Sequence, residues 1–287
     1  MVTRRCTQRQ FLLLPSNASK VSVRYALAMA QRATGAQIHV VCVLSNHYHI
    51  ILSIGLGLLP EFVYILNKYI AKCMNAHYGR WENLFAAGVQ ASYVRCEDED
   101  AIVDKSVYSI TNPVKDGLVR RSEDWPGVLL WRPNTYVCKR PSVFFQQTDD
   151  PDGPCPPKLP LVITPPPLES FENQRGILEH LGREVYDTER EVRRRFRAEG
   201  RRFLGVERIL AQHHTDTPTS REPRRRISPQ VASRDKWRRV ERLQQNKEFV
   251  RKHGLAMKDF ADGDHNVLFP AGTYLMRKRF NVRCAEP

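Results

Sequence analysis

The chain has 287 residues, with 45 Lys and Arg against 31 Asp and Glu, and its net charge is +14. This surplus favours a polyanionic partner, nucleic acid first and an acidic membrane surface second. No stretch approaches the ~20 consecutive apolar residues of a membrane span, and the run Phe11–Leu14 is too short for a signal peptide. The seven cysteines contain no C-x-x-C pair, which argues against a zinc ribbon or a disulfide framework and fits a reducing cytosol.

The first half of the chain alternates short apolar runs with amphipathic stretches. Runs of Val, Ile and Leu bounded by turn residues predict strands, and apolar residues at helical spacing predict helices. The expected elements are a strand at Gln10–Leu14, a helix at Ala18–Thr34 capped by Ser16 or Asn17, strands at Ile38–Leu44 and Tyr48–Ser53, a helix at Leu59–Tyr78, a strand at Gly88–Cys96 and a helix at Asp98–Thr111. This β-α-β-β-α-β-α order predicts an α+β fold, an antiparallel split βαβ sheet with helices on one face.

The second half of the chain is marked by proline and arginine. Residues 149–168 include Pro165-Pro-Pro167, and this density of proline predicts a linker. The linker would separate a catalytic domain, residues 1–148, from a basic and mainly helical accessory region, residues 169–287. Cations of that region are expected to contact the DNA backbone. The candidates are Arg193, Arg194, Arg197, Arg201, Arg224, Arg225, Arg226, Arg238, Arg239, Arg277, Lys278 and Arg279.

Two histidines follow a Ser45-Asn46 turn inside an apolar region. Side chains at positions i and i+2 of a strand point to the same face, so His47 and His49 are expected side by side, with Tyr48 on the other face. Two imidazoles on one rigid face form half of a site for a divalent metal. A short His-x-His motif is common, so these histidines could equally be ordinary polar residues of a sheet surface.

Tyr108 and Asn112 stand four residues apart near the end of a predicted helix, and therefore on one helical face. Tyr108 is the candidate nucleophile, because Tyr25, Tyr64 and Tyr69 have no hard-metal ligand four residues later. Asn112 precedes a proline, which disfavours helical backbone there, so Asn112 is expected to be the last helical residue or a cap.

The two motifs, His47-Tyr-His49 and Tyr108-Ser-Ile-Thr-Asn112-Pro, resemble the IS200-like, single-tyrosine HUH transposases, and most closely the branch associated with repetitive extragenic palindromes (REP). The resemblance covers about residues 9–131. It implies a ferredoxin-like core in which His47, His49 and Asn112 hold Mg²⁺ or Mn²⁺. It also implies that Tyr108 attacks single-stranded DNA near a hairpin, becomes linked to the 5′ phosphate and leaves a free 3′ hydroxyl.

The resemblance therefore predicts a metal-dependent, single-stranded DNA endonuclease and strand transferase. A nucleic-acid-binding protein without catalysis on the same fold is the main alternative. A replication or conjugation initiator is another, although the sequence contains no G-x-x-x-x-G-K-[ST] phosphate loop. The expected location is the bacterial cytosol, at the nucleoid, as a monomer or a homodimer.

Overall fold

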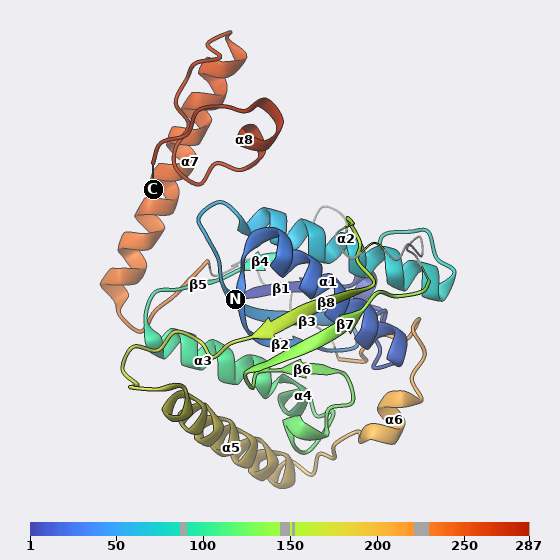
Figure 1. Ribbon diagram of the computed structural model, residues 1–287. Helices are drawn as coiled ribbons and strands as arrows, with labels where there is room; N and C mark the ends of the chain where they lie inside the picture. Colours follow the sequence, from blue (N-terminus) through green and yellow to red (C-terminus); the bar gives the residue numbers. More distant parts are fainter. Residues whose placement is uncertain (87–90, 144–149, 151–152, 221–229, 287) are drawn as a thin grey trace.

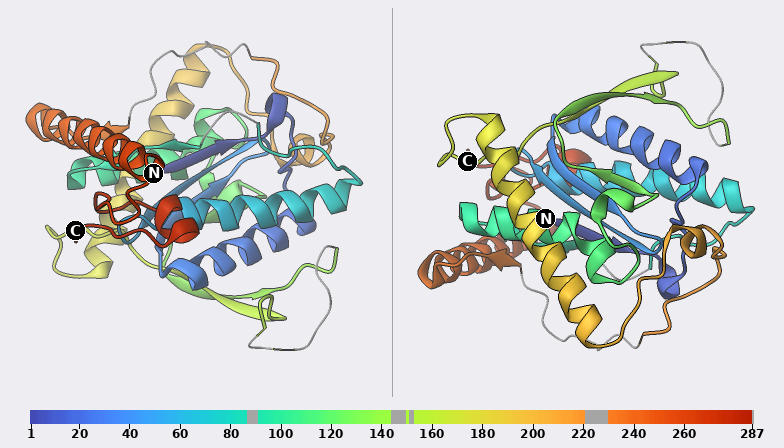
Figure 2. Two further views of the ribbon diagram at one scale, coloured as in Figure 1. Left: turned by 90° about the horizontal axis from the view of Figure 1, so that it is seen from above. Right: turned by 90° about the horizontal axis from the view of Figure 1, so that it is seen from below.

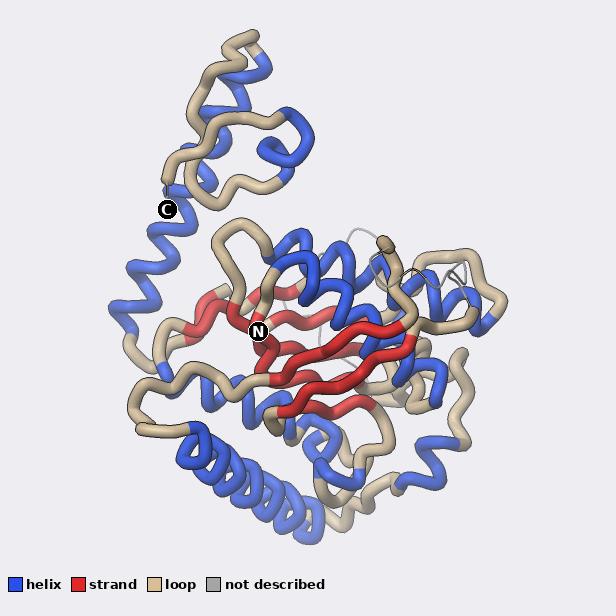
Figure 3. The backbone as a smooth tube through the Cα atoms, viewed as in Figure 1, coloured by secondary structure: helices blue, strands red, loops and turns tan. Residues whose placement is uncertain are grey.

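The computed structural model describes residues 1–86, 91–143, 150, 153–220 and 230–286. A mixed, mostly antiparallel sheet lies at its centre with helices around it (Figures 1 and 3). The strands are β1 (Val2–Arg5), β2 (Gln37–Val43), β3 (His47–Ser53), β4 (Ser92–Tyr93), β5 (Arg95–Cys96), β6 (Val128–Leu130), β7 (Asn134–Lys139), β8 (Lys158–Ile163) and β9 (Val231–Ala232). The helices are α1 (Asn17–Thr34), α2 (Leu59–Tyr78), α3 (Glu99–Ile110), α4 (Asn112–Lys115), α5 (Gln174–Ala198), α6 (Val206–Leu210), α7 (Lys236–Ala261) and α8 (Leu275–Phe280), with 3-10 turns at Thr7–Arg9 and Ser122–Asp124.

The strand order in the central sheet is β4-β1-β3-β2-β8-β7, and β6 also pairs with β2. Pairing is antiparallel throughout, except between β2 and β8. Helix α1 connects β1 with β2, and α2 connects β3 with β4. The predicted α+β class is confirmed. Among the described residues, no helix is long and apolar enough to cross a membrane.

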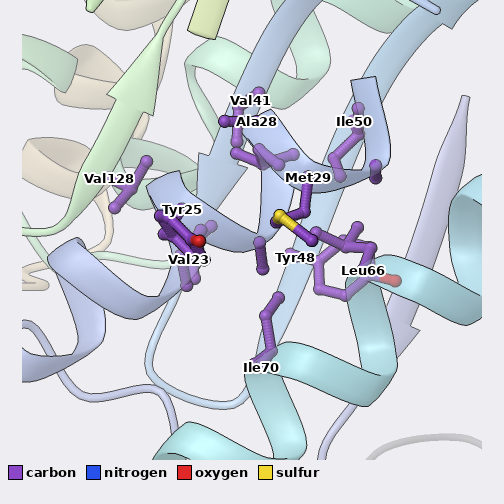
Figure 4. Packing of buried hydrophobic residues seen from close by; sticks show 14 of the residues in the cluster. Val23, Tyr25, Ala28, Met29, Val41, Tyr48, Ile50, Leu66, Ile70 and Val128 are labelled. Carbon is purple, nitrogen blue, oxygen red and sulfur yellow. The ribbon is translucent and has the colours of Figure 1, made fainter. Parts of the chain in front are cut away.

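Strands β2 and β3 form the predicted hairpin around Ser45-Asn46. Tyr48 lies on one face of β3, fully buried against α1 and α2 in the larger apolar core (Figure 4). Ile51 lies on the opposite face, where it joins Val40 of β2 and apolar residues of α3 and α5. The sheet is therefore covered on both faces, with α1 and α2 on one side and α3, backed by α5, on the other (Figure 2). The expectation of helices on one face is wrong, because Val40 of β2 and Ile51 of β3 are buried on the second face.

The first strand was predicted in the wrong place. Strand β1 is Val2–Arg5, and of its four residues only Val2 is buried, so the segment gives no apolar signal. Residues 10–14 form a turn instead, in which Leu12 and Leu13 are buried in the core. The predicted strand Gly88–Cys96 is represented by β4 and β5, and its residues 88–90 lie outside the described part of the chain.

The predicted linker contains a strand of the central sheet. Strand β8 pairs with β7 along its whole length, and Leu161 is completely buried in the core. Pro160 lies within β8, although proline removes a backbone donor. The strand meets β2 only at the Ile38–Ile163 pair, so most of β8 has a strand partner on one side only, where a missing N–H is tolerated.

Helix α5 belongs to the same folded body as the sheet. Its residues Ile177, Leu181 and Val185 pack with Val107 and Ile110 of α3, which lies directly on the sheet. Glu189 accepts a hydrogen bond from the Ser122 backbone N–H at 2.7 Å. Part of the segment predicted as an accessory region thus covers the face of the sheet that carries the two histidines.

We expect Leu181→Ala to lower the free energy of unfolding by about 2–5 kcal/mol, because it removes buried methyl groups and leaves a cavity. Urea unfolding of the full chain measures this change. Leu255→Ala is the matched control, since Leu255 of α7 is half exposed. Equal effects of the two substitutions would show that α5 does not contribute to the core.

The C-terminal arm, residues 230–286, extends away from the sheet (Figure 1). It has its own small apolar cluster, built around Phe269. Ion pairs fasten it to the body, including Arg234 to Asp100 at 3.2 Å and Arg242 to Glu97 at 2.8 Å. The acidic residues that open α3 therefore anchor this arm as well as capping the helix, where Asp98 accepts a hydrogen bond from the Ala101 N–H at 2.7 Å.

Candidate active site

The two motif histidines lie on the face of β3 that α3 covers. The ring centroids of His47 and His49 are 4.9 Å apart, with the planes nearly perpendicular. Tyr48 points to the other face, where its hydroxyl donates to the Asn67 side-chain oxygen at 2.8 Å. The prediction that the two imidazoles share one face is confirmed.

Both histidine rings are held by a neighbouring polar side chain. His49 Nδ1 lies 2.8 Å from Thr3 Oγ1, and His47 Nδ1 lies 2.7 Å from Asn46 Oδ1. Strand β1 supplies Thr3, because it pairs with β3 in a register that sets Thr3 opposite His49 and Arg5 opposite His47. Sequence reasoning missed Thr3 and Arg5, since their place in the site follows from a strand without an apolar pattern.

The environment of His49 favours the neutral imidazole. Burial, and then the nearby charges of His47 and Arg5, hold the pKa of His49 well below its ordinary value. His49 Nε2 is buried and has no hydrogen-bond partner among the residues that the structure describes. A neutral ring nitrogen held in place through the opposite nitrogen is the form in which histidine binds a metal.

Tyr108 lies next to these histidines. Its ring centroid is 5.4 Å from that of His49, at an interplanar angle of 81°. The side chain is 40% exposed, so a substrate can reach it, whereas Tyr25 and Tyr48 are completely buried. The Lys115 Nζ lies 5.0 Å from the centre of the Tyr108 ring. Burial and the neighbouring Arg195 lower the pKa of Lys115.

Asn112 is placed by a break between two helices. Helix α3 ends at Ile110, Thr111 caps it, and Asn112 opens the short helix α4 with Pro113 behind it. Proline suits the first turn of a helix, because the backbone N–H groups there have no hydrogen-bond partner within the helix and proline lacks this N–H. Asn112 is buried, and its side-chain oxygen has no hydrogen-bond partner. Asn112 thus begins a helix, and the expectation that it is a last helical residue or an end cap is wrong.

The donor atoms fit a hard divalent ion. His49 Nε2 and Asn112 Oδ1 are buried without partners, which costs free energy unless another group satisfies them. Within the described part of the chain, no three His, Cys, Asp or Glu side chains gather where they could hold a metal. A metal held by His47, His49 and Asn112 would have two imidazoles and an amide oxygen as protein ligands, a set that leaves positions open for substrate oxygens and water.

The predicted DNA-binding cations do not form one surface. Arg193, Arg194, Arg197 and Arg201 lie on or just after α5, and the others that can be placed lie on α7 and α8, on the far side of the sheet (Figure 1). Several are held by protein groups: Arg193 pairs with Glu189 at 3.1 Å, and Lys278 with Glu61 at 2.5 Å. Arg238 and Arg239 of α7 and Arg277 and Arg279 of α8 are exposed. Arg224, Arg225 and Arg226 lie outside the described residues.

No protein-family model and no curated protein sequence matches the chain. A solved structure of a REP-associated tyrosine transposase bound to a REP hairpin is similar over 44% of this chain and 72% of that one, at 22% identity and a TM-score of 0.36. This likeness is distant and does not assign the chain to a family. The function of the chain therefore has to be argued from its own residues.

Proposed function

We propose that the chain is a metal-dependent endonuclease and strand transferase that acts on single-stranded DNA near a hairpin, with Tyr108 as the nucleophile. One observation carries this proposal. An accessible tyrosine lies beside a buried imidazole, and two buried atoms, His49 Nε2 and Asn112 Oδ1, have no hydrogen-bond partner within the described residues.

The topology supports the same proposal. Strand order β4-β1-β3-β2, with α1 and α2 as the two connections, is the arrangement that a ferredoxin-like core requires. In such a core of the HUH type, the two histidines occupy a central strand and the tyrosine a helix packed across it. The positions of His47 and His49 on β3 and of Tyr108 on α3 support a core of this type.

The proposed reaction is a transesterification. The Tyr108 phenol oxygen attacks the phosphorus of a phosphodiester, and the bond from phosphorus to the 3′ oxygen breaks. The phenol loses one proton, and the departing 3′ oxygen takes one up to become a hydroxyl. The 5′ phosphate stays on Tyr108 as a phosphotyrosine ester. Attack by a 3′ hydroxyl on this ester rejoins a strand without ATP, because the ester conserves the energy of the bond.

Each residue of the site has a role in this reaction. Thr3 and Asn46 orient the two imidazoles, and His47, His49 and Asn112 would hold Mg²⁺ or Mn²⁺. A bound divalent ion would polarise a non-bridging phosphate oxygen and offset the charge that develops on the phosphate. The phenol of a tyrosine side chain ordinarily has a pKa of ~10, so the phenolate needs stabilisation. Lys115, with its ammonium group close to the Tyr108 ring, would supply it.

Covalent adduct formation tests the proposal. The full chain is incubated with a panel of single-stranded oligonucleotides, with and without hairpins, in the presence of Mn²⁺, and then separated under denaturing conditions. We expect a labelled protein band when the label is at the 3′ end of the oligonucleotide. A 5′ label should appear only on a shortened, free oligonucleotide. Tight binding of every substrate without an adduct would instead support a nucleic-acid-binding protein without catalysis.

A further inference from the structure

A groove of about 750 Å³ lies beside the C-terminal end of α5, outside the candidate active site. Its walls come from residues 119–124, the last turns of α5 and residues 201–206. Five arginines line it, together with one carboxylate, that of Asp124. The arginines are Arg120, Arg193, Arg197, Arg201 and Arg202. We call this feature the α5 groove.

The five arginines are of two kinds. Arg193 and Arg201 are fixed by the protein: Arg193 donates to the Arg120 carbonyl oxygen at 2.9 Å and pairs with Glu189, and Arg201 lies 3.9 Å from the centre of the Phe196 ring. The other three, Arg120, Arg197 and Arg202, are exposed and have no ion-pair partner within the described residues. Three of the five guanidinium groups of the groove are therefore not paired with a carboxylate of the described residues.

The walls of the groove are held in place by backbone hydrogen bonds. The Leu204 N–H donates to the Gly117 carbonyl oxygen at 2.8 Å, and the Gly205 N–H donates to that of Leu118 at 2.9 Å. Phe203 stacks on Phe196, with centroids 4.9 Å apart. Gly117 has a φ of +75°, and a Cβ there would lie 2.9 Å from the Phe196 ring, so the close approach of α5 requires glycine. The arginines thus project from a fixed frame.

The α5 groove is linked to the candidate active site by α4, which packs on α5. Gly117, which approaches Phe196 of the groove, lies two residues after α4, the short helix that Asn112 opens and that contains Lys115. Arg195, one residue before Phe196 on α5, is close enough to Lys115 to lower its pKa. Lys115 in turn has its ammonium group 5.0 Å from the centre of the Tyr108 ring.

We infer that the α5 groove binds backbone phosphates of the single DNA strand that is cleaved at Tyr108. This inference rests on the proposed function and adds to it a place for the substrate. Guanidinium groups match phosphate oxygens with two parallel hydrogen bonds, and three of them here have no other partner. The volume of the groove is in the range of ligand sites. Phe203, which is half-buried, offers part of its ring to a base of the same strand.

The test compares two triple variants that change the net charge equally. The groove variant is Arg120→Gln, Arg197→Gln and Arg202→Gln. The control variant is Arg175→Gln, Arg183→Gln and Arg190→Gln, which alters exposed arginines of α5 outside the groove. Both are made in a Tyr108→Phe chain, so that binding is measured without cleavage, by fluorescence anisotropy of a labelled single-stranded oligonucleotide over a range of salt concentrations.

We expect the groove variant to bind roughly 100-fold more weakly than its Tyr108→Phe parent at about 0.1 M salt, with a salt slope smaller by about 2, because three phosphate contacts are lost. Arg197→Gln alone should cost roughly 5-fold by the same relation and guards against a folding defect in the triple variant. Equal affinities of the groove and control variants would overturn the inference. So would displacement of the oligonucleotide by a free mononucleotide at micromolar concentration, because the groove would then serve a small ligand.

The outcome also separates this inference from the proposed function. The groove variant could bind DNA more weakly than the control while the protein with Tyr108 intact forms no covalent adduct with any substrate. This result would support the groove as a DNA-binding site and contradict the proposed catalysis. The protein with Tyr108 intact could instead form an adduct while the groove and control variants bind DNA equally well. This result would support the proposed catalysis and contradict DNA binding by the groove.

Discussion

Tyr108→Phe is expected to abolish the covalent protein–DNA adduct while single-stranded DNA still binds. The substitution removes the oxygen that attacks phosphorus, and the loss of a nucleophile lowers the rate by on the order of 10⁶-fold in well-studied enzymes. The stability of the fold should change by no more than about 0.5 kcal/mol, because the Tyr108 side chain is partly exposed. Denaturing electrophoresis with a 3′-labelled oligonucleotide and Mn²⁺ measures the adduct, and anisotropy measures binding.

The control for this experiment is a second tyrosine at a comparable surface position. Tyr64 of α2 is 60% exposed, and Tyr64→Phe should leave the adduct unchanged. Survival of the adduct in Tyr108→Phe would remove Tyr108 from the mechanism, and peptide mapping would then locate the modified residue. An adduct on the 5′ side of the cleaved bond, seen with a 5′ label, would contradict the proposed 5′-phosphotyrosine.

The sequence could predict those parts of the site that depend on residues only a few positions apart. Alternation along β3 sets His47 and His49 on one face, and the sequence shows that alternation directly. Asp98 caps the start of α3, the helix that carries Tyr108, and the predicted helix began at this residue. These features depend on neighbours within a few residues, where local backbone geometry determines which side chains can meet.

The remaining features depend on contacts between distant segments. Thr3 reaches His49 only because β1 pairs with β3. The sequence of β1 has too few apolar residues to predict a strand. Helix α5 was expected to bind DNA because it is rich in arginine, yet one of its faces covers α3 in the core. Its arginines and its apolar residues occupy different faces of one helix, so overall composition could not separate its packing role from its charge.

His47→Ala combined with His49→Ala is expected to abolish metal-dependent adduct formation and to remove the high-affinity binding of Mn²⁺ by the free protein. Both side chains lie on a rigid strand, and the buried His49 Nε2 has no protein partner to lose. Isothermal titration with Mn²⁺ measures affinity without reference to DNA, and circular dichroism checks the fold. His77→Ala is the control, because His77 is an exposed histidine near the end of α2.

Two further substitutions separate a metal site from a merely polar one. Thr3→Val keeps the shape of the side chain but removes the hydrogen bond to His49 Nδ1, so Mn²⁺ affinity should fall by roughly 10–100-fold, as it does when a residue behind a ligand is lost. Asn112→Asp keeps an oxygen at the position of Oδ1 and adds negative charge, so it should retain Mn²⁺ binding, whereas Asn112→Ala should weaken it.

Adduct formation by the double histidine variant in the presence of EDTA would mean that the reaction needs no metal at this site. Equal Mn²⁺ affinities for Asn112→Asp and Asn112→Ala would exclude Asn112 as a ligand and leave the two imidazoles as the protein's contribution.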